Sequence, residues 1–179
     1  LETSPRGLVW MTTPHDDKEG WARMHKIAPY FSPHTVTCGA GGLTPRTALQ
    51  MPTYAYPMFI AYANQDPDLI YSVTKAMLVH YPLYKDAAPG ADGLAADKQT
   101  LSWVVPHHAG AVRALKEAGV WKAEHEAHNQ KILQRQSVLI EAWAAFMKAP
   151  PADKEAFHIG WMAARKAALV KAGMDPVFE

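Results

Sequence analysis

Apolar residues recur along the chain in two patterns, and the change from one to the other divides the sequence. In the first part, short β-prone runs cover residues 7–13, 35–38 and 57–63, each bounded by proline, glycine or polar turn residues. Runs of this kind are typical of strands. The third, Pro-Met-Phe-Ile-Ala-Tyr-Ala, is apolar throughout, so we expect it to be covered on both faces. After Asp97 the apolar positions follow a period near that of an α-helix.

Capping residues and prolines mark the ends of the predicted helices. Asp16-Asp17 offers an N-cap for a first helix, which ends before Pro29. Asp66-Pro67 places an N-cap directly before a proline, which favours the start of a second helix there. We expect that helix to end before Pro82, because proline interrupts the hydrogen bonding of a helix interior.

Two further helices are predicted over 122–148 and 153–172, and each carries one apolar stripe. A stripe of this width must be covered, and the link at Pro150-Pro151 is short and stiff. We therefore expect a helical hairpin that packs on the preceding part of the chain. The pattern as a whole predicts an α/β unit over residues 1–121 and a helical hairpin tail over 122–179.

Charge and composition exclude several classes of partner. The chain has 18 Lys+Arg against 17 Asp+Glu and no basic stripe, so we expect no nucleic-acid partner. Its apolar runs are short and interrupted by polar residues, so we expect no direct insertion into a membrane. The single cysteine allows neither an intramolecular disulfide nor a thiolate metal cluster.

The nine histidines suggest a metal site, but their spacing does not support one. His125 and His128 are three residues apart, whereas the zinc-peptidase pattern requires His at i and i+4 with Glu directly after the first. His107 and His108 are adjacent, so their side chains point in different directions and chelate poorly. Neither a nucleophile elbow nor a Walker loop is present. We expect no catalytic residue, no metal and no cofactor, and hence a protein that is not an enzyme.

Three segments, in their order and spacing, resemble the TAXI family, the solute receptors of TRAP transporters. Residues 66–76 resemble the helix that ends in Thr-Lys-Ala in that family, 105–112 its Pro-x-His-Pro-Gly-Ala segment, and 114–121 its Lys-Glu-x-Gly-Ile/Val-Trp ending. The resemblance extends over residues 50–121 and, loosely, over the preceding fifty. It departs from the family at Ala109, where the family has proline, and in the tail, which continues beyond the family's ending.

The resemblance implies an α/β chain that forms the C-terminal part of a periplasmic-binding-protein-like, type II, two-lobed fold, with a helical C-terminal tail. It implies an extracytoplasmic receptor that captures a small, carboxylate-bearing solute for the TRAP membrane permease subunits. The implied location is the periplasm, with the leader not present in this chain. The alternative, from a different class, is a structural or interaction module whose C-terminal helices bind a partner.

Residues that face the cleft of such a receptor are expected in the extended segment 44–56. Thr44, Tyr54 and Tyr56 are the ligand-binding candidates. The tyrosines offer rings on which a ligand can stack and hydroxyls that can donate hydrogen bonds. Two surface tyrosines without a binding role remain an equally good interpretation of the same pattern.

Overall fold

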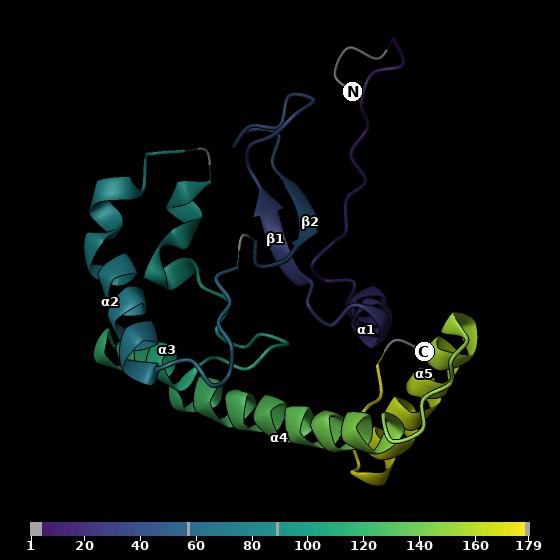
Figure 1. The fold of residues 1–179 in the computed structure, drawn as a ribbon. Coiled ribbons are helices and arrows are strands. Elements are labelled where there is room, and N and C mark those ends of the chain that lie inside the picture. Colours follow the sequence, from purple (N-terminus) through teal and green to yellow (C-terminus); the bar gives the residue numbers. More distant parts are fainter. Residues whose placement is uncertain (1–4, 57, 89, 178–179) are drawn as a thin grey trace. The chain divides into compact units, whose positions relative to one another are not determined.

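The computed structural model describes residues 5–56, 58–88 and 90–177. They form two units: one ends at Tyr56 and also includes Val177, and the other ends at Pro176. The described chain is mixed α/β, with five α-helices and one two-stranded sheet (Figure 1). None of the described helices combines the length and the apolar character that crossing a membrane requires.

The first unit is built on an antiparallel ribbon in which β1 (Ser32–Val36) pairs with β2 (Leu49–Thr53). In its register Pro33 lies opposite Pro52. The helix α1 (Lys18–Ile27) precedes the ribbon. Asp17 caps it by accepting a hydrogen bond from the backbone N–H of Gly20, which confirms the predicted start of this helix.

The prediction of a strand over residues 7–13 is wrong, although the end of this segment contacts the ribbon. The backbone N–H of Thr13 donates to the carbonyl oxygen of Gln50 (2.7 Å), and the Thr12 hydroxyl donates to the same oxygen (3.0 Å). A strand needs a ladder of such bonds along its length. Here the contacts are confined to the end of the run, so no strand forms. The strand predicted over 35–38 corresponds only in part to β1, which begins at Ser32.

The apolar run over 57–63 was the strongest strand prediction, and it is wrong for residues 58–63; residue 57 lies outside the described residues. Phe59 is 71% exposed and Ile60 is 89% exposed. An apolar run becomes a buried strand only where neighbouring strands pair with it and cover both faces. Within the described residues the only sheet is the β1–β2 ribbon, so the run has no ladder to join.

The second unit is helical, and α2 (Pro67–Tyr84) packs against α3 (Ala109–Glu117). Asp66 caps α2 as predicted, because its side chain accepts a hydrogen bond from the backbone N–H of Asp68. The predicted end of α2 is wrong, since the helix continues through Pro82. A proline this close to the C-terminus disturbs only the last turn of a helix.

A small core lies around α3, between α2 and the links before and after α3; the second link leads to α4 (Ala123–Phe146). Before α3 the chain passes through two short 3-10 helices, η1 (Ala91–Leu94) and η2 (Ala96–Lys98). Four buried side chains form this core, and two partly buried ones pack against it: Leu101, Val112, Leu115 and Trp121, with Leu78 and Val120.

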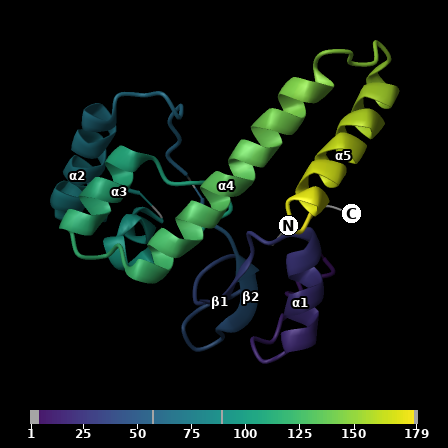
Figure 2. The same ribbon diagram turned by 90° about the horizontal axis from the view of Figure 1, so that it is seen from below.

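The helices α4 and α5 (Lys154–Lys171) lie side by side as a hairpin (Figure 2), and their bounds agree with the sequence prediction. Asp153 caps α5 through the backbone N–H of Ala156 (2.8 Å). Four aromatic rings interlock between the two helices, with centroids 4.8–6.2 Å apart: Trp143, Phe146, Phe157 and Trp161. It stays a prediction that this hairpin is a tail packed on an α/β unit over residues 1–121.

Candidate functional site

The ligand-binding residues predicted from the sequence lie at opposite ends of the ribbon. Tyr54 directly follows β2, and Tyr56 is two residues further on. Thr44 lies in the connection between the strands, which leaves the ribbon at the other end, where Val36 pairs with Leu49. The structure therefore brings Tyr54 and Tyr56 together, with ring centroids 6.2 Å apart, and separates both from Thr44 by the length of the ribbon.

The two tyrosines belong to a cluster of four aromatic side chains, which we call the tyrosine cluster: Tyr30, Phe31, Tyr54 and Tyr56. Tyr30 and Phe31 immediately precede β1, and the ribbon register brings them beside the residue that follows β2. The rings of Tyr30 and Phe31 meet the ring of Tyr54 edge to face, at centroid distances of 6.3 and 5.9 Å. Such geometry is the favoured one for aromatic pairs, and it orients Tyr54.

In the tyrosine cluster, the ring of Tyr54 is half-exposed and packed against its neighbours, whereas the ring of Tyr56 is largely exposed. Tyr54 is 50% exposed and Tyr56 is 81% exposed. Both rings can stack on a planar or apolar group, and both hydroxyls can donate to an acceptor such as a carboxylate. The sequence interpretation missed Tyr30 and Phe31. The signal that would have included them was an aromatic pair just before a predicted strand.

The Thr44 side chain takes part in a local turn. The Thr47 hydroxyl accepts from the backbone N–H of Thr44 (2.9 Å), lies 3.0 Å from the Thr44 hydroxyl, and donates to the carbonyl oxygen of Gly42 (2.7 Å). Bonds of this kind stabilise turns rich in threonine and glycine. Thr44 is exposed, and the register places it at the end of the ribbon away from the tyrosine cluster.

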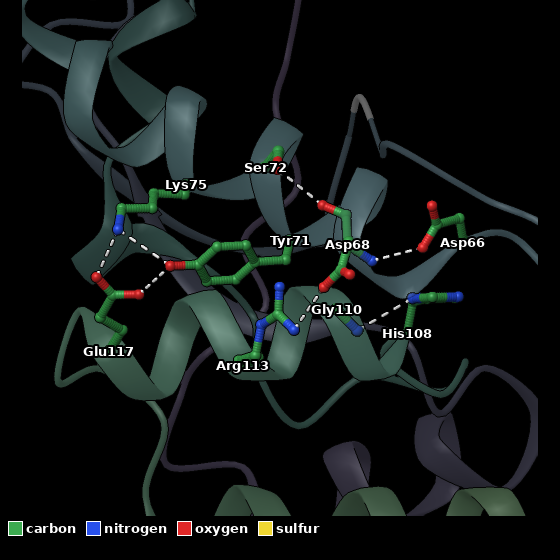
Figure 3. A network of polar contacts seen from close by, with 9 residues as sticks. All are labelled: Asp66, Asp68, Tyr71, Ser72, Lys75, His108, Gly110, Arg113 and Glu117. Atoms are coloured by element: carbon green, nitrogen blue, oxygen red, sulfur yellow. Dashed lines mark hydrogen bonds and ion pairs between the residues drawn. The ribbon is translucent and has the colours of Figure 1, made fainter.

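The segments that carry the family resemblance meet at the interface of α2 and α3 (Figure 3). Lys75 on α2 donates from Nζ to Glu117 Oε1 on α3 (2.7 Å) and to the Tyr71 hydroxyl (3.0 Å), and that hydroxyl donates to the second carboxylate oxygen of Glu117. The hydrogen bond to Glu117, followed by the one to Tyr71, raises the pKa of Lys75. The hydrogen bond from Lys75, followed by the one from Tyr71, lowers the pKa of Glu117.

Arg113 completes the contact from the α3 side. Its guanidinium lies over the ring of Tyr71, 3.8 Å from the centroid, and Nη1 is 2.8 Å from the Asp68 carboxylate (Figure 3). The Tyr71 hydroxyl already accepts from Lys75 and donates to Glu117, so the ring and its hydroxyl are both engaged. This network joins the two helices.

The histidines considered as metal ligands are engaged elsewhere. His108 and His125 accept backbone hydrogen bonds at helix starts, and His128 Nε2 lies 2.6 Å from the carbonyl oxygen of Trp103. Within the described residues, His, Cys, Asp and Glu nowhere gather in groups of three suited to a metal ion. That the protein is not an enzyme stays a prediction.

A model of the NMT1-like family matches residues 13–119. Neither a curated protein nor a solved structure gives a significant match to the chain. The matched region includes the ribbon, the tyrosine cluster, α2 and α3. The family is periplasmic-binding-protein-like, which agrees with a mixed α/β chain and points to a general role in binding solutes outside the cytoplasm. The match covers more than half of the chain, so the protein belongs to the NMT1-like family.

Proposed function

We propose that the protein serves as a solute receptor of a TRAP-type transporter, of the TAXI kind, and captures a small carboxylate-bearing solute in the periplasm for the membrane permease subunits. The observation that carries this proposal is the family match over residues 13–119. Solute binding follows from the family. The TAXI assignment rests on the resemblance of the segments that form the α2–α3 interface, and the carboxylate is what the same resemblance implies.

The binding residues proposed are Tyr54 and Tyr56. The neighbouring rings of Tyr30 and Phe31 both contact the ring of Tyr54 edge to face, so a ligand that stacks on Tyr54 loses little side-chain entropy. Tyr56 is the more exposed ring, and its hydroxyl is available to a carboxylate. Thr44 is not part of this site, since it lies at the far end of the ribbon.

Within this proposal, residues 1–121 carry the receptor function and residues 122–179 form a tail that packs on them. The receptor works by binding alone, without a catalytic group, a metal or a cofactor. Elemental analysis of the purified protein tests that statement: stoichiometric zinc or iron would contradict it and favour an enzyme.

Thermal unfolding in the presence of dicarboxylates and amino acids tests the proposal directly. A ligand at about a hundred times its dissociation constant stabilises the folded state by roughly 2.7 kcal/mol, which is readily seen as a rise in Tm. We expect Tyr54→Ala and Tyr56→Ala to abolish the rise. The matched control is Tyr62→Ala, which removes a ring of the same 81% exposure as Tyr56 from outside the cluster and should preserve the rise.

The second candidate is an interaction module that uses the C-terminal helices. It is favoured by apolar side chains left open on the hairpin: Ile140 and Ile159 are each 61% exposed, and Val170 is 56% exposed. Solitary apolar residues on a surface are ordinary, but several on one hairpin indicate a contact surface. No Tm shift with any small acid, together with loss of self-association or permease binding in Ile140→Ser, would favour this candidate over the receptor.

A further inference from the structure

The helix α4 has a second face on which apolar residues gather, and α5 does not cover it. Five residues spaced alternately by four and three form this face, and all of them are exposed: Leu133, Ser137, Ile140, Ala144 and the C-cap Met147. Residues with this spacing lie on one side of a helix, and the spacing is that of the contact line between the helices of a coiled coil. We call these five residues the α4 seam.

The α4 seam is distinct from the face that α4 turns toward α5. On that face, the ring of Phe146 meets the rings of Phe157 and Trp161, with centroids 5.1 and 5.8 Å apart. A helix turns by about 100° per residue, so Met147 points well away from the direction of Phe146. The hairpin therefore covers one apolar side of α4 and leaves the α4 seam open.

Large and small side chains alternate along the α4 seam. Ser137 and Ala144 are small, and each stands between two of the large residues Leu133, Ile140 and Met147. Two copies of such a seam fit best when they run antiparallel, because each large residue can then meet a small one. In a parallel pair every residue faces its own equivalent, so the layers of small residues would be left underfilled.

One antiparallel register matches these sizes over the central four residues of the α4 seam. Its twofold axis is level with residues 138–139. Leu133 then lies opposite Ala144 of the second copy, and Ile140 lies opposite Ser137 of the second copy. The symmetry repeats both contacts with the two copies exchanged. The α4 seam is thus self-complementary, as the interface of a twofold dimer must be.

The residues that border the α4 seam suit the same register. It brings Gln134 beside Glu141 of the second copy, so the amide can donate a hydrogen bond to the carboxylate. On the other border it brings Gln136 beside Trp143 of the second copy, and Trp143 is 40% exposed despite its contacts with α5. Residues 136–147 contain one charged side chain, that of Glu141. A helix that lies on a membrane carries lysine and arginine along its polar face, so these borders favour a second helix over a membrane.

We propose that the α4 seam docks against the α4 seam of a second copy of this chain, so that two hairpins associate as an antiparallel, twofold-symmetric dimer. The second copy removes from water the large side chains that each hairpin leaves exposed. This dimer goes beyond the proposed function, because it assigns one face and one occupant to the hairpin surface and does not depend on solute binding. The contact uses one helix from each copy, so we expect a reversible dimer with a dissociation constant in about the micromolar range.

Sedimentation equilibrium of the full chain measures the association. A chain that stays monomeric at about 100 µM would overturn the proposal. Ile140→Glu places a charge on the α4 seam of both copies and should weaken the dimer by about 100-fold or more, because a buried charge without a partner is costly. The matched control is Ile159→Glu on α5, at a residue of the same 61% exposure, which should leave the dissociation constant within about twofold. Equal weakening by both variants would also overturn the α4 seam as the contact.

Two substitutions at Gln134 test the register, and we expect them to act in opposite directions. Gln134→Lys faces Glu141 of the second copy and should tighten the dimer, whereas Gln134→Glu faces the same carboxylate and should weaken it. One exposed ion pair contributes little, but the symmetry makes two, so we expect about fivefold in each direction and no difference in about 1 M salt. Both replacements are good helix formers, so a change in helix stability alone would not give opposite signs.

The same sign for both Gln134 variants, or no effect of either, would overturn the antiparallel register. Circular dichroism of each variant checks that its helices are retained. No solute enters these measurements, so their outcomes leave the receptor proposal to its own test by thermal unfolding.

Discussion

Gly110 in α3 lies directly against the backbone of α2, facing the carbonyl oxygen of Pro67. A Cβ atom at residue 110 would stand 2.2 Å from that oxygen and 2.7 Å from the backbone nitrogen of Tyr71. Both neighbours are main-chain atoms, which cannot rotate aside as a side chain can. The close approach of the two helices therefore depends on the absence of a side chain at this position.

We expect Gly110→Ala to destabilise the protein by about 1–3 kcal/mol, the usual effect of forcing extra volume into a packed contact. Urea unfolding followed by circular dichroism measures it. The matched control is Gly93→Ala, where a new Cβ meets nothing within 4 Å. A Gly110→Ala effect no larger than that of the control would show that α2 and α3 do not approach as closely as described.

Because the guanidinium of Arg113 stacks on the ring of Tyr71, we expect its planar shape to contribute more to stability than its charge does. Arg113→Lys should lose about 0.5–1 kcal/mol of stability, because lysine cannot stack its planar group on the ring. This loss should persist in about 1 M salt, a concentration that screens exposed ion pairs. Asp68→Asn removes only the exposed ion pair, so its smaller effect should disappear in salt. Equal salt dependence of both variants would contradict this assignment.

The environment of Glu126 predicts that the stability of the protein depends on pH in the acid range. The hydrogen bond from Lys116, followed by those from Gln130 and Trp121, lowers the pKa of Glu126 from 4.5 to about 2. A carboxyl whose pKa is depressed on folding stabilises the folded state above its unfolded value, and this contribution is lost as the pH falls through 4.5 toward 2. In urea titrations, Glu126→Gln should therefore show a flatter fall of stability between these pH values than the unmodified protein. Parallel profiles would contradict the prediction.

The interlocked rings of the hairpin predict a graded response to truncation. Trp161 is partly buried, and Trp161→Ala should cost near the lower end of about 3–5 kcal/mol. Trp143 is 40% exposed, so Trp143→Ala should cost less. Ile159→Ala on the exposed side of α5 is the control and should stay within about 0.5 kcal/mol. Thermal unfolding ranks the three; a control as damaging as Trp161→Ala would contradict the assigned packing.

Local signals predicted the helices, because a cap and an apolar period need only neighbouring residues. Asp17 and Asp66 cap helices as predicted. A strand needs a pairing partner, which can lie far away in sequence, and the run over 57–63 illustrates the difference. Its apolar character shows that burial would be favourable, but it says nothing about which segment provides it.

The same limit applies to the candidate site. Tyr54 and Tyr56 are predicted, with Thr44, because all three lie in the extended segment 44–56. Tyr30 and Phe31 join them through the pairing of β1 with β2, and Thr44 is separated from them by the same pairing. Register is set by side-chain packing and by the connection between strands, neither of which is visible in the residue pattern of one segment.

The facing prolines of the ribbon, Pro33 and Pro52, bear on how copies of this protein meet at high concentration. The carbonyl oxygen of Gln50 points away from β1, toward Thr13, and Pro52 lies two residues further along the same edge. Backbone groups two residues apart point the same way, so each proline occupies an outward position of its strand. Proline has no N–H to offer there, so an incoming chain cannot continue the ladder on either side. Both open edges of this small sheet are thereby protected against fibrillar aggregation.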